Sequence, residues 1–298
     1  MGTVNATRIG LFGVGLMGHG IASNLVRHGH DLIFFDHPGN QPTANLLLAG
    51  ARGTADAAEV ARHADLLMLC VTGSPQVEAI MLGESGVLPH LRPGSLVVDC
   101  STSIPSSTEQ IARQVVAAGC RFIDSPMTRL PKDAAAGRLN LLVGGDRSDV
   151  EQALPVLRCF AENITHVGSV GAGHRMKLLH NYVSLGSAVL IAEAAACAHI
   201  GGIDLQVLVD VLAKGGGGGA ALERMRAHLT QGDPTGLQFT LANALKDLTY
   251  YNTMAEQSRA DRTIAAAVAN TLHQAAEQGD PQDYVPQLVE RLVERQRR

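Results

Sequence analysis

Short apolar runs alternate with longer helical stretches along the first half of the chain. The runs are continuous rather than alternately polar and apolar, which is typical of strands buried on both faces of a parallel sheet covered by helices. A helix is predicted at residues 16–27, directly after the first run. The predicted strands lie at residues 9–12, 32–35, 66–71, 96–99, 122–124, 141–145 and 164–167.

The pattern changes after Gly168. A long segment rich in Ala and Leu follows residues 171–173, and from there to the end the sequence has no strand-like run. We therefore predict two domains. Residues 1–168 form an α/β domain with a mostly parallel, doubly wound sheet, and residues 169–298 form an all-α domain that opens with one long helix.

A glycine-rich segment, GVGLMG at residues 13–18, joins the first predicted strand to the first predicted helix. The spacing GxGxxG alone is a weak signal, but this copy lies between a strand and a helix, and Asp36 ends the next strand. The glycines allow a tight turn, close approach of a pyrophosphate and close helix packing, while the helix N-terminus attracts the anion. The pattern predicts a dinucleotide-binding Rossmann domain. The residues assigned to the pyrophosphate are Gly13, Gly15, Leu16, Met17 and Gly18.

Asp36 favours NAD over NADP as the cofactor. A carboxylate at the end of this strand can accept hydrogen bonds from the adenosine ribose, and it repels a 2′-phosphate. The sequence DHPGN at residues 36–40 also offers no arginine to bind that phosphate. Val71 and Thr72, where a later strand ends, are assigned to the same cofactor site.

Composition points to a small-molecule partner. The chain of 298 residues carries a net charge of −4, only 3% aromatic residues and no Trp, which argues against nucleic acid and anionic membranes. Residues 183–203 are apolar but include Glu193 and His199, so we interpret them as a core helix. The N-terminus lacks a secretory pattern. Five widely spaced cysteines without a CxxC pair favour reduced thiols in the cytoplasm and no metal site.

Five segments along the chain resemble the motifs of a known family: GVGLMGHGIASNL at 13–25, DCSTSIP at 99–105, DSPMTRLPKDAAAGRLNLLVGG at 124–145, GAGHRMKLLHNY at 171–182 and KDL at 246–248. In these segments and in their order, the chain resembles the β-hydroxyacid dehydrogenases, the family of 3-hydroxyisobutyrate dehydrogenase and tartronate semialdehyde reductase. The resemblance implies a substrate bound between a Rossmann domain and a helical domain like that of 6-phosphogluconate dehydrogenase, and a homodimer or homotetramer. It implies that Ser101 and Thr102 lie beside the substrate and the nicotinamide. It also implies that Lys246 and Asp247 close over the cofactor.

The resemblance makes Lys177 the catalytic lysine and Asn181 its partner. Spaced i,i+4, the two residues share one face of a helix. When hydride passes between nicotinamide and substrate, an ammonium group can stabilise the alkoxide and exchange its proton, while an amide holds the oxygen. One alternative is a surface lysine on an amphipathic helix. Another is a histidine base, His174 or His180, although neither has an acidic partner nearby in the sequence.

Residues 128–130 depart from the family pattern, because Thr-Arg-Leu stands where Ser-Gly-Gly usually cradles the substrate carboxylate. The guanidinium of Arg129 can form two parallel hydrogen bonds to a carboxylate, sulfonate or phosphate. Sulfolactaldehyde reductases of the family are similar at this position. We assign Thr128, Arg129 and Leu130 to a small anionic substrate. The alternative is that Arg129 pairs with a surface carboxylate such as Asp133.

These observations predict an NAD-dependent oxidoreductase that interconverts a small anionic 3-hydroxy acid, or hydroxy-sulfonate, and its semialdehyde, with Lys177 as general acid and base. Reduction of sulfolactaldehyde, succinic semialdehyde or glyoxylate would be a specific form of this activity. Imine reductases share the architecture but typically lack the lysine. A non-catalytic dinucleotide-binding module is the third hypothesis, against which Lys177, Asn181 and the KDL segment argue.

Overall fold

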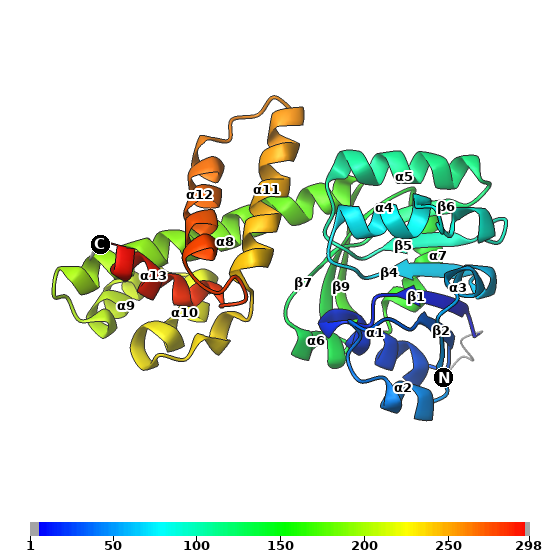
Figure 1. Cartoon of the computed structure of the whole chain (residues 1–298), viewed down its shortest axis with the longest axis horizontal. Coiled ribbons are helices and arrows are strands. Elements are labelled where there is room, and N and C mark those ends of the chain that lie inside the picture. Colours follow the sequence, from blue (N-terminus) through cyan, green and yellow to red (C-terminus); the bar gives the residue numbers. More distant parts are fainter. Residues whose placement is uncertain (1–5, 296–298) are drawn as a thin grey trace. The chain divides into compact units, whose positions relative to one another are not determined.

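The computed structural model describes residues 6–295 (Figure 1). Two compact units make up the chain, the first ending at Lys177 and the second beginning at Leu178. The first unit is α/β and the second is helical, as the sequence predicts.

The first unit is built on a sheet of nine strands within residues 6–295, in the order β3-β2-β1-β4-β5-β6-β8-β7, with β9 beside β8. Strands β1 to β6 pair in parallel, whereas β8 runs antiparallel to β6 and β7. This confirms the mostly parallel, doubly wound sheet. The strands are β1 (Arg8–Phe12), β2 (Asp31–Phe35), β3 (Arg52–Thr54), β4 (Leu66–Leu69), β5 (Leu96–Asp99), β6 (Arg121–Asp124), β7 (Met127–Thr128), β8 (Leu139–Gly144) and β9 (Ala161–Gly168).

Helices cover both faces of this sheet, and each face has its own apolar core. Leu66 and Met68 of β4 belong to one core, whereas Leu67 and Leu69 belong to the other. Successive strand residues point to opposite faces, so burial of both faces explains the continuous apolar runs. The helices are α1 (Leu16–Arg27), α2 (Ala44–Leu48), α3 (Ala57–His63), α4 (Ser74–Leu82), α5 (Pro105–Ala117), α6 (Pro131–Ala135) and α7 (Arg147–Leu157).

Two strands escaped sequence prediction. β3 has three residues and β7 has two, so neither carries a hydrophobic period that could be recognised. β3 also lies beside β2 with its first two residues exposed. Such strands form because a neighbouring strand offers hydrogen-bonding groups, not because their own side chains favour burial.

The second unit is helical within the residues described. After Gly168 the only β pairing in residues 169–295 is an isolated bridge between Thr240 and Tyr284. Its core is made of Leu, Val, Ala and Met side chains from the packed helices. The long helix α8 (Ala172–Ile200) runs across the junction of the two units. The other helices are α9 (Leu205–Lys214), α10 (Ala220–Gln231), α11 (Leu241–Gln257), α12 (Thr263–Gln278) and α13 (Leu288–Arg295).

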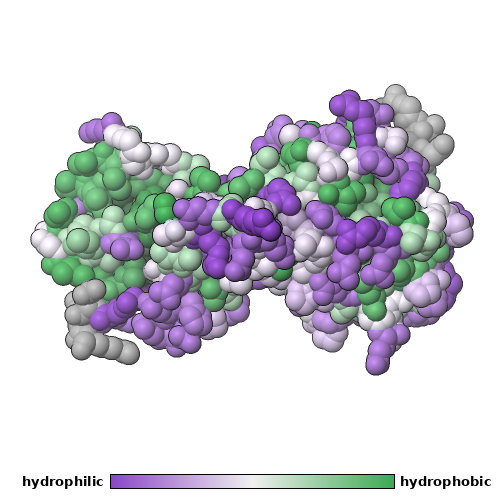
Figure 2. All heavy atoms as spheres, turned by 90° about the horizontal axis from the view of Figure 1, so that it is seen from above, coloured by the Kyte–Doolittle hydropathy of each residue, from purple (hydrophilic) through white to green (hydrophobic). Residues whose placement is uncertain are grey.

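Helix α8 is long and apolar enough to cross a membrane by length and composition alone. However, 44% of its most apolar window is buried inside the chain, and core helices of soluble proteins meet the same criterion. Its exposed face carries Met176, Leu179, Val183 and Leu190. Figure 2 shows hydrophobic side chains gathered over the part of the helical unit that carries the end of α8 and α9.

Candidate active site

The three motif glycines meet different surroundings. A Cβ at Gly13 would lie 2.2 Å from the carbonyl oxygen of Cys70, and one at Gly18 would lie 1.9 Å from that of Gly13. Gly13 also has a φ of +94°, which favours glycine. A Cβ at Gly15, by contrast, would meet no heavy atom within 4 Å. Gly13 and Gly18 are therefore required by close backbone packing, whereas Gly15 leaves open space beside the backbone.

That open space lies at the N-terminus of α1, where Gly15 is the residue before the helix. The first helical turn, residues 16–19, holds no acidic side chain. Free N–H groups, a positive helix end and room beside the backbone suit a pyrophosphate. The residues present therefore fit a dinucleotide, with Gly15, Leu16 and Met17 placed to hold its phosphates.

The segment after β2 supports the glycine loop. The N–H of Val14 donates to Asn40 Oδ1 at 3.3 Å, and the N–H of Gln41 donates to the Val14 carbonyl at 2.8 Å. Asn40 Nδ2 also donates to the carbonyl of Phe35 at 3.1 Å. Asn40 is a site residue that the motifs do not mark, although an Asn shortly after a strand end is a recognisable turn residue. Asp36 itself is exposed at the end of β2.

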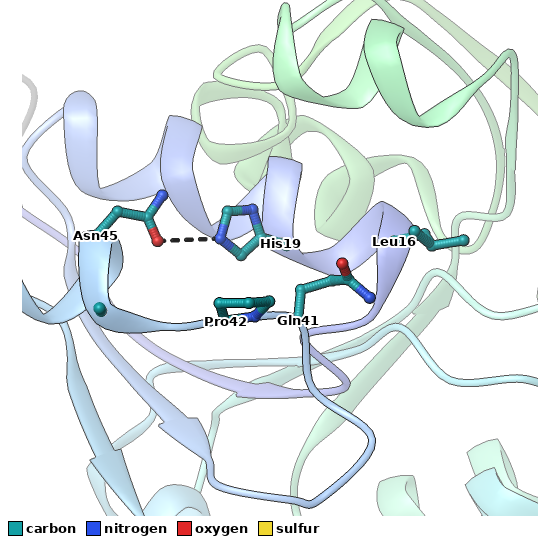
Figure 3. A pocket seen from close by; sticks show the side chains of 6 residues that line it. Leu16, His19, Gln41, Pro42 and Asn45 are labelled. Atoms are coloured by element: carbon teal, nitrogen blue, oxygen red, sulfur yellow. Dashed lines mark hydrogen bonds between the residues drawn. The ribbon is translucent and has the colours of Figure 1, made fainter.

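A pocket of about 450 Å³ opens beside the first turn of α1 (Figure 3). His19 spans it, with Nε2 3.1 Å from Asn45 Oδ1 at the start of α2. His19 therefore links two helices of the nucleotide-binding unit. The pocket is lined by Leu16, His19, Gln41, Pro42, Ala44 and Asn45.

The ends of β4 and β5 come together at Ser101. Its hydroxyl oxygen accepts a hydrogen bond from the N–H of Val71 at 3.1 Å, and its own N–H donates to Asp99 Oδ1 at 2.9 Å. Ser101 is buried and Thr102 half-buried, while Thr72 is exposed beyond Val71. The parallel strands thus bring Val71 and Ser101, predicted separately, to one edge of the sheet.

Lys177 is buried, with 8% of its surface exposed. Its Nζ donates a hydrogen bond of 2.7 Å to the carbonyl of Met127 in β7. The alternative of a surface lysine is therefore wrong. The contact places the ammonium group next to Thr128, whose hydroxyl accepts a hydrogen bond from Asn140 Nδ2 at 3.2 Å.

His174, three residues before Lys177, is completely buried. Its Nδ1 lies 3.7 Å from Asp124 Oδ2, and its Nε2 lies 3.8 Å from Asp99 Oδ2. No acidic residue close in the sequence pairs with His174, but the fold brings two carboxylates to it from the ends of β5 and β6. Burial raises the pKa of the Asp124 carboxyl above its usual value, and His174 and two backbone N–H groups partly offset this effect.

Arg129 has a φ of +83°, a conformation that glycine adopts more easily. Its Nη1 lies 2.5 Å from the carboxylate of Glu162 in β9 and also donates to the carbonyl of Arg138. Asp133, the partner considered from the sequence, instead accepts a hydrogen bond of 3.3 Å from the N–H of Leu130 at the start of α6. The guanidinium thus forms a carboxylate pair, with a different residue from the one expected.

The second unit brings three further predicted residues together. Asn181 Nδ2 donates to Asp247 Oδ2 at 2.5 Å, and Lys246 Nζ lies 3.2 Å from Asp247 Oδ1. Asn181 and Asp247 are both buried. His180 Nδ1 lies 2.9 Å from Asn181 Oδ1, so the amide of Asn181 is held from two sides. Within residues 6–295 no group of three His, Cys, Asp or Glu side chains is arranged to bind a metal ion.

Both halves of the chain match known protein families. Residues 8–168 match the NAD binding domain of 6-phosphogluconate dehydrogenase, and residues 171–292 match the NAD-binding domain of NADP-dependent 3-hydroxyisobutyrate dehydrogenase. The chain belongs to the β-hydroxyacid dehydrogenase family. It is an NAD(P)-binding oxidoreductase that acts on the hydroxyl group of hydroxy acids.

Individual relatives agree with this assignment. The 3-hydroxyisobutyrate dehydrogenase of Pseudomonas aeruginosa is 32% identical over 92% of this chain and 93% of its own. The 3-sulfolactaldehyde reductase of Escherichia coli is 32% identical over 89% of this chain and 84% of its own. A Mycobacterium tuberculosis 3-hydroxyisobutyrate dehydrogenase with L-serine superposes with a TM-score of 0.86 at 27% identity, over 96% of this chain and 99% of its own.

The space at Gly15 gives a direct test of the cofactor site. Gly15→Ala should keep the melting temperature of the wild type, because the new methyl group meets no protein atom. It should raise the dissociation constant for NADH about tenfold or more, because a charged hydrogen bond at the backbone is worth about 1.5–3 kcal/mol. Titration of NADH fluorescence measures this constant. Gly18→Ala is the matched comparison and should lower the melting temperature; wild-type NADH affinity in Gly15→Ala would contradict the assignment.

Proposed function

We propose that this enzyme interconverts a small anionic 3-hydroxy acid, or hydroxy-sulfonate, and its semialdehyde with NAD(H), using Lys177 as general acid and base. The observation that supports this most is the burial of the Lys177 ammonium group against the Met127 carbonyl, beside Thr128.

We place the domain boundary near residue 168, so that the helix carrying Lys177 belongs with the helical domain.

When bound, the nicotinamide supplies or accepts the hydride. Lys177 stabilises the negative charge that develops on the substrate oxygen, then donates its proton; in oxidation it accepts that proton. Asn181, one turn further along α8, fixes the same oxygen, and Asp247 orients its amide.

Ser101 is suited to hold the substrate. Its hydroxyl oxygen already accepts a hydrogen bond from the N–H of Val71, so its own proton is available to donate to an anionic or carbonyl oxygen. Thr102 follows it at the end of β5, where we place the nicotinamide side of the site. Lys246, beside Asp247, adds a positive charge next to the carboxylate that binds Asn181.

Replacement of the ammonium group tests the mechanism. Lys177→Ala should lower kcat by about 10²- to 10⁴-fold, the usual contribution of general acid–base catalysis, with little change in NADH affinity. NADH consumption is measured with sulfolactaldehyde, succinic semialdehyde, glyoxylate and tartronate semialdehyde, and with L-serine and 3-hydroxyisobutyrate in the oxidative direction. Lys132→Ala, at an exposed lysine on α6, is the control. Full activity of Lys177→Ala on a substrate of the wild type would refute this role.

Arg129 and Leu130, with Thr128, form the proposed site for the substrate anion. The guanidinium pairs with the carboxylate of Glu162, which supports a role in binding anionic oxygens. Glu162 is half exposed, and an exposed ion pair contributes little free energy. A substrate carboxylate or sulfonate can therefore replace Glu162 as the partner of Arg129 at a small cost in free energy. In this arrangement Glu162 competes with the substrate for Arg129.

Two substitutions should therefore move KM in opposite directions. Arg129→Ala should raise KM for an anionic aldehyde about 10²-fold, because charged hydrogen bonds are lost. Glu162→Gln should lower it severalfold, because the competing charge is removed. Steady-state kinetics at saturating NADH gives both values. Arg138→Ala, at an exposed arginine that pairs with Asp133, is the control. An unchanged KM in Arg129→Ala would rule out the anion site.

NAD is the proposed cofactor, with NADP disfavoured. The exposed Asp36 carboxylate at the end of β2 would accept the ribose hydroxyls and repel a 2′-phosphate. Neighbouring residues 37–40 carry no arginine or lysine that could attract such a phosphate.

Asp36→Ala should relax this preference. We expect the ratio of kcat/KM for NADH over NADPH to fall about tenfold or more, because a like-charge repulsion is removed while ribose hydrogen bonds are lost. Asp31→Ala, at the opposite end of the same strand, should leave the ratio unchanged. A wild type that already prefers NADPH would show that Asp36 does not select the cofactor.

We also infer a homodimer or homotetramer in the cytoplasm. Met176, Leu179, Val183 and Leu190 form an exposed apolar stripe on α8 that a second subunit could cover. The cysteines in the described part of the chain are free thiols, which suits a reducing compartment.

A further inference from the structure

The proposed reaction does not use the most deeply buried ionisable cluster of the first unit. Asp99 ends β5, Asp124 ends β6 and His174 lies in the first turn of α8, and all three are fully buried. Removing such groups from water is costly unless they are paired and hydrogen-bonded. Their position, between Ser101 and the turn that carries Lys177, indicates that the cluster positions the site.

Asp124 caps α8 from outside the helix. Its Oδ1 accepts the N–H of Gly171 at 2.7 Å, and its Oδ2 accepts the N–H of His174 at 2.8 Å. A carboxylate here satisfies N–H groups that a helix N-terminus leaves open and interacts favourably with the helix dipole. The strand end of β6 is thereby fixed to the helix that carries Lys177.

Glycines make this approach possible. A Cβ at Gly144 would lie 2.6 Å from Asp124 Oδ1, and one at Gly173 would lie 2.7 Å from Oδ2. Gly171 has a φ of +87°, which turns its N–H towards the carboxylate. Gly144, Gly171 and Gly173 therefore leave room for the Asp124 carboxylate, and the N–H of Gly171 reaches it.

The His174 ring continues the connection to the next strand. Its Nε2 lies 3.2 Å from the carbonyl oxygen of Ser101, which can only accept, so Nε2 carries a proton and donates. Its Nδ1 lies 2.8 Å from Thr108 Oγ1 in α5. The ring thus joins α8 to the backbone of Ser101 on one side and to α5 on the other.

We propose that His174 is a positioning residue that sets the distance between Ser101 and Lys177. It is fixed to Ser101 through its ring and precedes Lys177 by three residues, less than one helical turn, on the same rigid element. In the proposed reaction, on which this inference rests, Lys177 and Ser101 both contact the substrate. A shift of about 1 Å in such groups is enough to cost about 10²-fold in rate.

Three variants separate positioning from general stability. His174→Ala should lower kcat about 10²-fold per folded molecule, with NADH affinity retained. His174→Gln, which keeps a donor towards Ser101, should recover most of this loss. Thr108→Val removes only the hydroxyl that orients the ring and should give an intermediate kcat even where His174→Ala fails to fold.

His30 provides the matched control. It is also a buried histidine of the first unit, hydrogen-bonded to the N–H of Thr7, and it precedes the amino end of β2, away from the strand ends that carry Ser101 and Asp124. His30→Ala should lower the melting temperature and leave kcat unchanged. Equal kcat in wild type and His174→Ala, or an equal loss in His30→Ala, would overturn the proposal.

A second measurement does not need a substrate. Reductive methylation of Lys177 by formaldehyde and cyanoborohydride, followed by mass spectrometry, reports how firmly its amine is held. We expect faster modification in His174→Ala and Thr108→Val and the wild-type rate in His30→Ala. If the wild type reduces none of the aldehydes and oxidises neither hydroxy acid, the proposed function fails and the labelling rates still decide the role of His174. A wild-type rate of Lys177 methylation in both His174→Ala and Thr108→Val would overturn the positioning role of His174.

Discussion

The carboxylate of Asp124, buried at the end of β6, holds the first turn of α8 through two backbone N–H groups. The position of Lys177 depends on this contact. Lys177 lies within the same helix, and the Met127 carbonyl that it binds follows β6 by three residues. A carboxylate that bonds directly to the backbone of another element leaves little freedom for that element to rotate or slide.

The same contact explains why this part of the chain is rich in glycine. The carboxylate can reach two N–H groups of α8 only if no side chains stand between the end of β6, the end of β8 and the helix. Cβ atoms at Gly144 and Gly173 would both lie within 2.7 Å of its oxygens. Packing around one buried charge therefore explains the glycines at 144 and 173, one in the GG segment and one in the GAG segment.

Most of the fold could be predicted from the sequence, because long buried elements leave periodic or continuous apolar patterns. Helix α1 begins and ends where the pattern places it, and the seven predicted strands are all present. β3 and β7 could not be found, since two or three residues carry no period and their pairing depends on a neighbouring strand. Tertiary context alone determines such elements.

The candidate site was predictable as a set of residues but not as a set of contacts. Motifs identified Lys177, Asn181 and Asp247 one at a time, whereas the hydrogen bond between Asn181 and Asp247 joins residues that are 66 apart in the chain. His174 shows the limit more clearly. Its two carboxylates lie 50 and 75 residues earlier, so no local spacing could reveal them.

Arg129 shows how a local change can alter a site without altering the fold. A left-handed backbone at this position suits glycine, yet the chain accepts an arginine there with a φ of +83°. Leu130 directly precedes α6, and the guanidinium is held by Glu162 and the Arg138 carbonyl. These contacts keep the arginine in place at this turn. In the proposed function, substrate preference depends on this one side chain and its carboxylate partner, while the Asp124 cap and the Lys177 contact stay intact.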